Sequence, residues 1–334
     1  MCWIAKGVEI FFELIVRLPA RAFPQVAFGL KSMSCFQKIE KEVEYSLVSM
    51  PTNAQISRYS RQILVPAIGI AGQSGLLNSK VLVIGAGGLG SPCILYLAAA
   101  GVGHIGVVDY DTVEISNLQR QIIHSETRIG LKKCESALTA IRNLNSDIIA
   151  VAYDVVLSSS NAKQIVAEYD IVCDCSDNVA TRYLVNDVCV LLGKPLVSGG
   201  ALRMDGQLTV YNYKGSPCYR CLFPTPPDPS TVTNCSDGGV LGVVTGIIGS
   251  AQALEVIRII TGMNKGDRHR MLVFDAQEMA FRTIKLRPRN RNCAICGDSP
   301  TITDVIDYIK FCGSSANDVT SIIILDSYST QHTG

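Results

Sequence analysis

The sequence predicts an α/β fold with a Rossmann-like, mostly parallel sheet, helices on both faces and an antiparallel extension. An apolar run, Val81–Ile84, leads into the glycine-rich turn Gly85–Gly90, and the residues from Leu89 to Ala100 are expected to form a helix. A second strand ends at Asp109, and a third, Ile171–Asp174, ends in a polar run. Strands that alternate with helices in this way pair in parallel, because each helix carries the chain back to the same end of the sheet.

The later segments extend this sheet. Helices are expected from Gly130 to Leu144 and over the residues that end at Val190, and a strand, Pro195–Ser198, then leads into two glycines. Alternation of apolar and polar residues predicts antiparallel strands, which are Gln207–Tyr213, Met271–Phe274 and Arg282–Leu286.

The composition excludes two classes of partner. The 334 residues carry a formal net charge of +1, which leaves no basic footprint for direct contact with nucleic acid. The apolar run Val240–Ile260 contains Gln252, Glu255 and Arg258, so it is expected to be a core helix rather than a membrane span. The apolar stretch Val8–Leu18 is too short to cross a bilayer, and its acidic residues argue against a transit peptide.

The turn after the first strand has a phosphate-binding pattern. Gly85, Gly87 and Gly90 have the spacing of the dinucleotide fingerprint, and the helix that follows directs its positive end and free N–H groups at an anion. Asp109 follows Gly90 by 19 residues and stands where a carboxylate can accept hydrogen bonds from ribose hydroxyls. The pattern predicts a nucleotide without choosing its chemistry, so a nicotinamide or flavin enzyme is an open alternative at this point.

A polar and cationic set follows the second strand. Asn117, Gln119 and Arg120 are close in sequence, and Lys133 lies on the next predicted helix. Amides donate to phosphate oxygens, arginine binds them in a fork, and lysine adds a point charge. Such a set stabilises charge on a transferred phosphoryl or nucleotidyl group, whereas hydride transfer does not need it. The alternative is that these side chains are solvated, which is the interpretation we adopt for Lys132.

Two carboxylates follow the third strand. Asp174 and Asp177 come at its carboxyl end, where open α/β sheets bind ligands. Both are therefore expected to position a triphosphate or its magnesium ion, and Asp177 is the stronger choice for the metal. The alternative is that Asp177 and Asn178 only cap the helix that follows.

The chain contains thirteen cysteines and no evident secretory signal, which favours metal binding or catalysis over a disulfide framework. Two Cys-x-x-Cys pairs offer four thiolates for a structural zinc ion, with a redox pair as the alternative. These pairs are Cys218 with Cys221 and Cys293 with Cys296. Four further cysteines fall in apolar patterns and are expected in the core, namely Cys93, Cys134, Cys173 and Cys189.

One more cysteine has a different setting. Cys235 lies in a stretch rich in Pro, Thr and Gly, a composition typical of a long surface loop. A helix expected from near Gly239 would direct its dipole at the thiol, so Cys235 is a candidate nucleophile. An incidental exposed cysteine is the alternative.

Together these motifs resemble the ubiquitin-activating superfamily, and within it the MoeB and ThiF type, which activates ubiquitin-like sulfur carriers. The segments that carry the resemblance are Arg58-Tyr-Ser-Arg61-Gln, GAGGLGSP, DYDTVEISNLQRQ, DCSDN, the two Cys-x-x-Cys pairs and TVTNCSDGGVLGVVTG. The loop around Cys235 and the segment TITDVIDYIKFCGSSAND favour the eukaryotic members, which serve molybdopterin biosynthesis and tRNA thiolation.

The resemblance implies roles for individual residues. The nucleotide-binding positions would be Gly88, Asp109, Ser116, Asn117, Leu118, Gln119, Arg120, Lys133, Asp177 and Asn178. Arg120 and Lys133 would act on the phosphates, and Asp177 on magnesium. Arg61 matches an arginine that reaches the ATP of a partner subunit, which implies a homodimer. Cys235 matches the thioester-forming nucleophile, and the zinc ligands would be Cys218, Cys221, Cys293 and Cys296.

The reaction that the resemblance implies is adenylylation. The C-terminal glycine of a ubiquitin-like carrier attacks the α-phosphate of ATP–Mg²⁺, and sulfur then displaces AMP to leave a thiocarboxylate. The implied partners are the ubiquitin-related modifier and the small subunit of molybdopterin synthase, with a cysteine desulfurase or a separate rhodanese as sulfur donor. The implied location is the cytosol, and tRNA would be reached through the carrier.

Three segments are expected along the chain. Residues 1–54 would form a partly disordered N-terminal extension, residues 55–300 an adenylylating ATP-binding domain with its zinc site, and residues 301–334 a C-terminal linker or truncated tail. Eukaryotic members usually continue into a rhodanese-like domain that this sequence lacks, so adenylylation is expected without sulfur transfer by the chain itself. The alternatives are an impaired truncated isoform or scaffold subunit and an NAD-dependent oxidoreductase.

Overall fold

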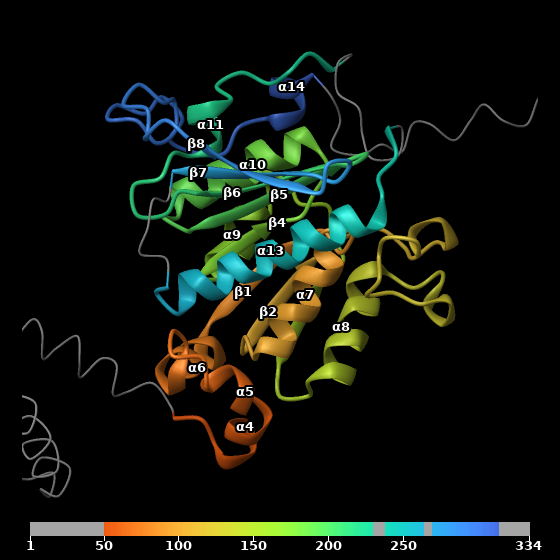
Figure 1. Cartoon of the computed structure of the whole chain (residues 1–334). Helices are drawn as coiled ribbons and strands as arrows, with labels where there is room; N and C mark the ends of the chain where they lie inside the picture. The colour runs from red at the N-terminus through yellow and green to blue at the C-terminus, as the bar shows by residue number, and fades with distance from the viewer. Residues whose placement is uncertain (1–49, 230–237, 264–268, 314–334) are drawn as a thin grey trace, which may run out of the picture. The chain divides into compact units, whose positions relative to one another are not determined.

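A single mixed sheet forms the centre of the computed structural model, which describes residues 50–229, 238–263 and 269–313 (Figure 1). Within these residues the strands are β1 (Lys80–Ile84), β2 (His104–Val108), β3 (Ile149–Tyr153), β4 (Ile171–Asp174), β5 (Leu196–Leu202), β6 (Asp205–Tyr211), β7 (Arg270–Asp275) and β8 (Ala280–Lys285). Their order in space is β3-β2-β1-β4-β5-β6-β7-β8. Strands β1 to β5 pair in parallel and β6 to β8 pair antiparallel, which confirms the predicted fold class.

The described helices cover both faces of the sheet (Figure 1). They are α4 (Asn53–Arg58), α5 (Ser60–Ile63), α6 (Gly69–Asn78), α7 (Gly90–Ala100), α8 (Lys133–Leu144), α9 (Ala162–Ala167), α10 (Val179–Leu191), α11 (Tyr219–Leu222), α13 (Gly242–Ile260) and α14 (Tyr308–Cys312). Two short 3₁₀ turns, η1 (Ile115–Asn117) and η2 (Glu126–Arg128), lie between β2 and α8.

Strand β1 feeds two separate apolar cores. Val81 and Val83 pack with α7, α8 and α13, whereas Leu82 and Ile84 pack with α9, α10 and α14. Successive side chains of a strand point to opposite faces, so one continuous apolar run serves both layers. The four cysteines predicted for the core are all buried, which confirms that expectation.

Two segments differ from the prediction. Strand β5 continues through Gly199 and Gly200 to Leu202. Helix α13 lies so close to this strand that a Cβ atom at Gly199 would stand 2.5 Å from Gln252 Oε1. Glycine here gives room to the neighbouring helix and does not end the strand. Strand β3 was not predicted, since as an edge strand it has no fully buried residue and gives only a weak apolar signal.

The apolar helix α13 is a core element, as predicted. It is the one described helix with the length and hydropathy of a membrane span. Its side chains at Val244, Ile248, Ala253 and Val256 are buried, and the helix packs against β5, β6 and α7. Gln252 is fully buried as well and donates to the carbonyl oxygens of Asp174 in β4 and Val197 in β5. The apolar face of α13 therefore reflects packing between the sheet and α7, whereas Val243 and Leu254 lie exposed on the other side of the helix.

A buried ion pair joins α10, α11 and α14. The Arg220 guanidinium donates to both carboxylate oxygens of Asp187 at 2.8 to 3.0 Å, and both side chains are almost completely buried. Tyr308 of α14 donates to the same carboxylate at 2.9 Å. The arginine also lies over the rings of Tyr183 and Phe311. The first part of the segment predicted as a C-terminal linker is thus packed onto the domain.

Substitution of Asp187 by asparagine is expected to lower the free energy of unfolding by about 3–5 kcal/mol, because it leaves the Arg220 charge buried without its counter-charge. Urea denaturation followed by circular dichroism measures this. The matched control is Asp304→Asn, which breaks the exposed pair with Lys163 and should change the midpoint far less. Equal midpoints for the two variants would contradict the account.

Candidate functional site

A cavity of about 860 Å³ opens at the carboxyl ends of β1 and β4. At this point the strand order reverses, since β2 and β3 lie on one side of β1 and β4 lies on the other. Open α/β sheets bind ligands at such a crevice. Its walls include the glycine turn, Asp109, Arg120, Lys133 and Asp177, which were all predicted from the sequence as site residues.

The glycine turn is shaped by two close approaches. Gly85 has φ +94°, and a Cβ atom there would stand 2.9 Å from the carbonyl oxygen of Cys175. A Cβ atom at Gly90 would stand 1.9 Å from the carbonyl oxygen of Gly85. No L-residue with a side chain fits either place without moving the backbone. The turn therefore brings the N-terminus of α7 directly over the end of β1.

Both polar backbone groups of Ala86 in this turn are held. Its N–H donates to Asp109 Oδ2 at 2.7 Å, and its carbonyl accepts from His124 Nε2 at 2.9 Å. The other imidazole nitrogen of His124 accepts from the Ser136 hydroxyl at 2.8 Å. A carbonyl can only accept, so the Nε2 atom carries the proton. Burial then lowers the pKa of His124 to about 4, which keeps the ring neutral.

A short chain of charged groups continues from Asp109. Its Oδ1 accepts the N–H of Asp111 at 2.9 Å, and the Asp111 carboxylate pairs with Lys133 Nζ at 2.8 Å. Burial raises the pKa of Asp109, although Lys133 acts in the opposite direction. Lys133 is the first residue of α8, and 8% of its side chain is exposed. The ammonium group is thereby fixed on the cavity wall.

The predicted run Ser116–Arg120 divides into two groups. Asn117 and Arg120 line the cavity, whereas Ser116, Leu118 and Gln119 are not among the described residues that do. Arg120 donates only to the backbone carbonyl of Ser116 in the described chain, so it has no carboxylate partner there. Asn117 Oδ1 accepts the N–H of Glu114, which closes the 3₁₀ turn η1.

The two aspartates after β4 have different environments. Asp174 is buried and its oxygens accept from Ser176 and Ser198, so it fixes the loop and is not among the described cavity-lining residues. Asp177 is exposed and lines the cavity. Asn178 alone supplies the helix cap, since its Oδ1 accepts the N–H of Thr181. The capping alternative thus applies to Asn178 and leaves the Asp177 carboxylate available to a ligand.

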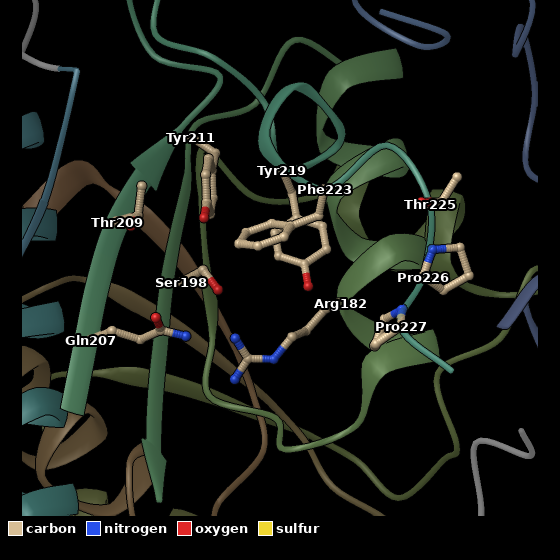
Figure 2. Close-up of a pocket in the computed structure, with 10 residues that line it drawn as sticks. All are labelled: Arg182, Ser198, Gln207, Thr209, Tyr211, Tyr219, Phe223, Thr225, Pro226 and Pro227. Carbon is tan, nitrogen blue, oxygen red and sulfur yellow. The ribbon is translucent and has the colours of Figure 1, made fainter. Parts of the chain in front are cut away.

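A second cavity, of about 420 Å³, adjoins the first. Arg182, Gln207 and Tyr219 line both. Figure 2 shows the Arg182 guanidinium beside Gln207, with the rings of Tyr211 and Tyr219 above it and Pro226 and Pro227 opposite. Arg182 Nη2 donates to the carbonyls of Ser176 and Gly199, so a cation forms the wall between the two cavities.

The two Cys-x-x-Cys pairs meet, although 71 residues separate them in the sequence. All four sulfur atoms lie within 4.8 Å of one another, and the sulfurs of Cys218 and Cys293 are 3.6 Å apart. A tetrahedral ion with bonds of about 2.3 Å requires sulfurs about 3.8 Å apart, so the cluster fits one metal ion. Hydrogen bonding with Cys218 first, and with the N–H of Asn290 as well, lowers the pKa of Cys221 to about 6.

Two predicted residues are not part of this geometry. Arg61, in α5, is exposed and does not belong to the described residues that line either cavity. Cys235 lies outside the described residues.

Sequence reasoning missed several residues that line the larger cavity. Four polar ones among them are Asp111, Gln121, Arg182 and Thr245. Asp111 could have been found from its place two residues after Asp109, and Gln121 from its place beside Arg120. Arg182 follows Asn178 by one helical turn on α10, so helical spacing marks it. Thr245 comes from α13, and nothing in the local sequence indicates that this helix reaches the glycine turn.

Comparison with known proteins assigns this architecture to a family. The sequence profile of the ThiF family matches residues 59–295. The chain belongs to the ThiF family.

Curated relatives agree with the family assignment. The chain is 54% identical over 280 residues to "Adenylyltransferase and sulfurtransferase MOCS3" of Aedes aegypti, covering 84% of this chain and 64% of that protein. It is 57% identical over 266 residues to the protein of the same name from Danio rerio, covering 80% and 58%. The ThiF-family chain therefore spans about three fifths of the length of these relatives.

Solved structures confirm the fold. The structure titled "Crystal structure of E. coli MccB + ATP" has a TM-score of 0.63 and 22% identity, covering 79% of this chain and 82% of that one. The structure titled "Crystal Structure of SeMet PaaA" has a TM-score of 0.61 and 18% identity, covering 81% and 88%.

The protein is expected to lose stability as the pH falls from about 6.5 toward 4, because the unfolded chain then protonates His124 while the folded state resists it. His124 is expected to lower the free energy of unfolding by about 1–2 kcal/mol between about pH 7.5 and pH 5. Urea unfolding at both pH values measures it. His124→Gln, which can still donate to Ala86, should remove that part of the pH dependence, and an unchanged pH dependence in this variant would contradict the assignment.

Proposed function

We propose that the chain adenylylates the C-terminal glycine of a ubiquitin-like sulfur carrier with ATP and Mg²⁺. The observation that carries the proposal is the convergence of a phosphate-binding glycine turn, two cations and an exposed carboxylate on one cavity. These groups are Gly88, Arg120, Lys133 and Asp177. The names of the curated relatives support the same reaction class.

The nucleotide occupies the larger cavity. Its phosphates lie against the glycine turn and the N-terminus of α7, where backbone N–H groups and the helix dipole favour an anion. Asp109 lines the same cavity and offers its remaining lone pairs to ribose hydroxyls. Lys133 and Arg120 face the triphosphate, and Asn117 and Asn178 contribute amide groups at the rim.

Magnesium fits the oxygen ligands on this wall. Asp111 and Asp177 both line the cavity and are exposed, and Mg²⁺ takes one or two carboxylates together with phosphate oxygens. When bound, the ion neutralises charge on the departing pyrophosphate.

The reaction brings two anions together. A carboxylate oxygen of the carrier's last glycine attacks the α-phosphorus, the bond from that phosphorus to the bridging oxygen breaks, and pyrophosphate leaves with the electron pair. Arg120 and Lys133 lower the repulsion between the carboxylate and the triphosphate and stabilise the charge that develops at phosphorus. The acyl-adenylate then exchanges AMP for a sulfur nucleophile. The product is a thiocarboxylate for molybdopterin synthesis and for thiolation of tRNA.

The smaller cavity suits the tail of the carrier. Its aromatic and proline walls leave room for an extended chain without large side chains, and Arg182 stands at its junction with the larger cavity. A carboxylate entering from this side would meet the guanidinium before it reached the phosphates (Figure 2).

The roles of Arg61 and Cys235 complete the proposal. Arg61 is exposed, which suits an arginine that serves the ATP of the partner subunit in a homodimer. Cys235 acts after adenylylation, as the thiol that receives the activated carrier, and a cysteine desulfurase or rhodanese supplies the sulfur. The free cysteines of the described residues suit a reducing compartment, and we place the reaction in the cytosol.

The cysteine cluster holds a structural zinc ion. Four thiolates in a closed set leave no position for substrate, so the ion stabilises the fold rather than taking part in the reaction. The cluster lies beside α11, whose Tyr219 lines both cavities, and zinc thereby fixes part of their wall.

Carrier-dependent exchange of pyrophosphate into ATP is expected to fall by about 100-fold or more in Lys133→Ala and in Asp177→Ala, because each removes a group that acts on the triphosphate. The exchange rate should also fall in Arg61→Ala. Cys235→Ala should retain the exchange but form no thiocarboxylate. Radiolabelled pyrophosphate, with and without a carrier that ends in Gly-Gly, measures the first step.

The matched control is Lys132→Ala. This neighbouring lysine is exposed, pairs with Asp154 and is not one of the described cavity-lining residues. Exchange at the wild-type rate in Lys133→Ala would overturn the assignment of the cavity, as would equal losses in both lysine variants.

Removal of zinc by a chelator is expected to lower the melting temperature and to make the four thiols reactive, because the ion crosslinks Cys218–Cys221 to Cys293–Cys296. Elemental analysis by mass spectrometry should find one zinc per chain in the wild type and much less in Cys293→Ser. A protein isolated with full activity and stability but without metal would contradict the proposal.

A further inference from the structure

One buried acceptor on the wall of the larger cavity has no partner. Gln121 is 3% exposed, and its Oε1 is the one buried side-chain oxygen or nitrogen in the described chain that makes no hydrogen bond. The same side chain lines the cavity. A buried carbonyl without a donor destabilises a protein, so native structures rarely keep one unless a ligand or water completes it.

The neighbours of Gln121 are already satisfied. His124 bonds the Ser136 hydroxyl through Nδ1 and the carbonyl of Ala86 through Nε2, and the Oδ1 of Asn117 accepts the N–H of Glu114. The backbone of Gln121 is held too, since its N–H donates to the carbonyl of Asn117 at 2.9 Å. The unpaired Oε1 is therefore an isolated exception in an otherwise complete polar layer.

The position of the side chain indicates which part of a ligand it meets. Gln121 follows Arg120 directly, and its Nε2 lies 3.8 Å from where a Cβ atom of Gly87 would stand. The amide thus lies against the middle of the glycine turn, the part of the cavity that would hold phosphates. A carbonyl oxygen only accepts, and phosphate oxygens at neutral pH carry no hydrogen to donate. The donors that an ATP–Mg²⁺ complex offers beside its phosphates are the ribose O–H groups and metal-bound water.

We propose that Gln121 is a nucleotide-binding residue whose Oε1 accepts a hydrogen bond from an O–H donor of the ATP–magnesium complex, either a ribose hydroxyl or a metal-bound water. The inference rests on the proposed use of the cavity for ATP. Gln121 would thus join the glycine turn and the cations Arg120 and Lys133 as a part of the nucleotide site. The free protein keeps an unpaired acceptor, and the nucleotide completes it.

The test is Gln121→Met, which keeps the length of the side chain and removes the acceptor. Without nucleotide, the variant should be at least as stable as the wild type, with a melting temperature unchanged or higher by about 1–3 °C, because the unpaired carbonyl is gone. Its Kd for ATP with Mg²⁺ should rise by about 3- to 10-fold. Differential scanning calorimetry and isothermal titration calorimetry measure the two quantities. Gln164→Met, the same change at an exposed position of α9, should alter neither.

Repeating the titration with AMP and no metal distinguishes the two donors. A weakened affinity that persists with AMP assigns the ribose hydroxyl, and one confined to ATP with Mg²⁺ assigns the metal-bound water. An unchanged Kd for ATP in Gln121→Met would overturn the inference, and so would a lowered melting temperature without nucleotide, which would make the residue structural. A wild-type protein that binds no ATP would instead refute the proposed function.

Discussion

The site depends on the restraint of one residue in the glycine turn. Ala86 gives its N–H to Asp109 and its carbonyl to His124, so neither group is free to turn. Asp109 also holds the N–H of Asp111, whose carboxylate fixes Lys133. One continuous set of hydrogen bonds therefore connects the turn after β1, the end of β2 and the start of α8. Displacement of the Ala86 peptide would move the glycine turn and the lysine together.

The second half of the site is held from a different direction. Residues 218–222 carry two cysteines of the four-thiol cluster, the arginine of the buried ion pair and Tyr219, which lines both cavities. Tyr183 of α10 donates to the carbonyl of Phe223, which fixes the chain just beyond this segment. The smaller cavity thus has walls that depend on the thiol cluster and on the pair of Arg220 with Asp187. Nucleotide and carrier tail would meet where these two separately restrained halves join.

The sequence was sufficient for those parts of the fold and site that depend on local patterns. Apolar runs placed β1 and β4, glycine spacing placed the turn, and Cys-x-x-Cys spacing marked the four cysteines whose sulfur atoms lie together. It was not sufficient where contacts between distant segments determine the role of a residue. Gly199 looked like the end of a strand, yet it serves the packing of α13, and Asp174 looked like a ligand although two serines occupy it. Gln121 follows Arg120 directly in the sequence, but its lack of a hydrogen-bond partner is a property of the folded cavity wall alone.

The central claim is that the glycine turn and the cations around it form one triphosphate site. The most direct measurement is a crystal structure with a non-hydrolysable ATP analogue and Mg²⁺. The account predicts the phosphates against residues 85–90, with Lys133 Nζ and the Arg120 guanidinium within hydrogen-bond distance and a metal ion beside Asp177. A nucleotide bound elsewhere, or these cations directed away from it, would contradict the account.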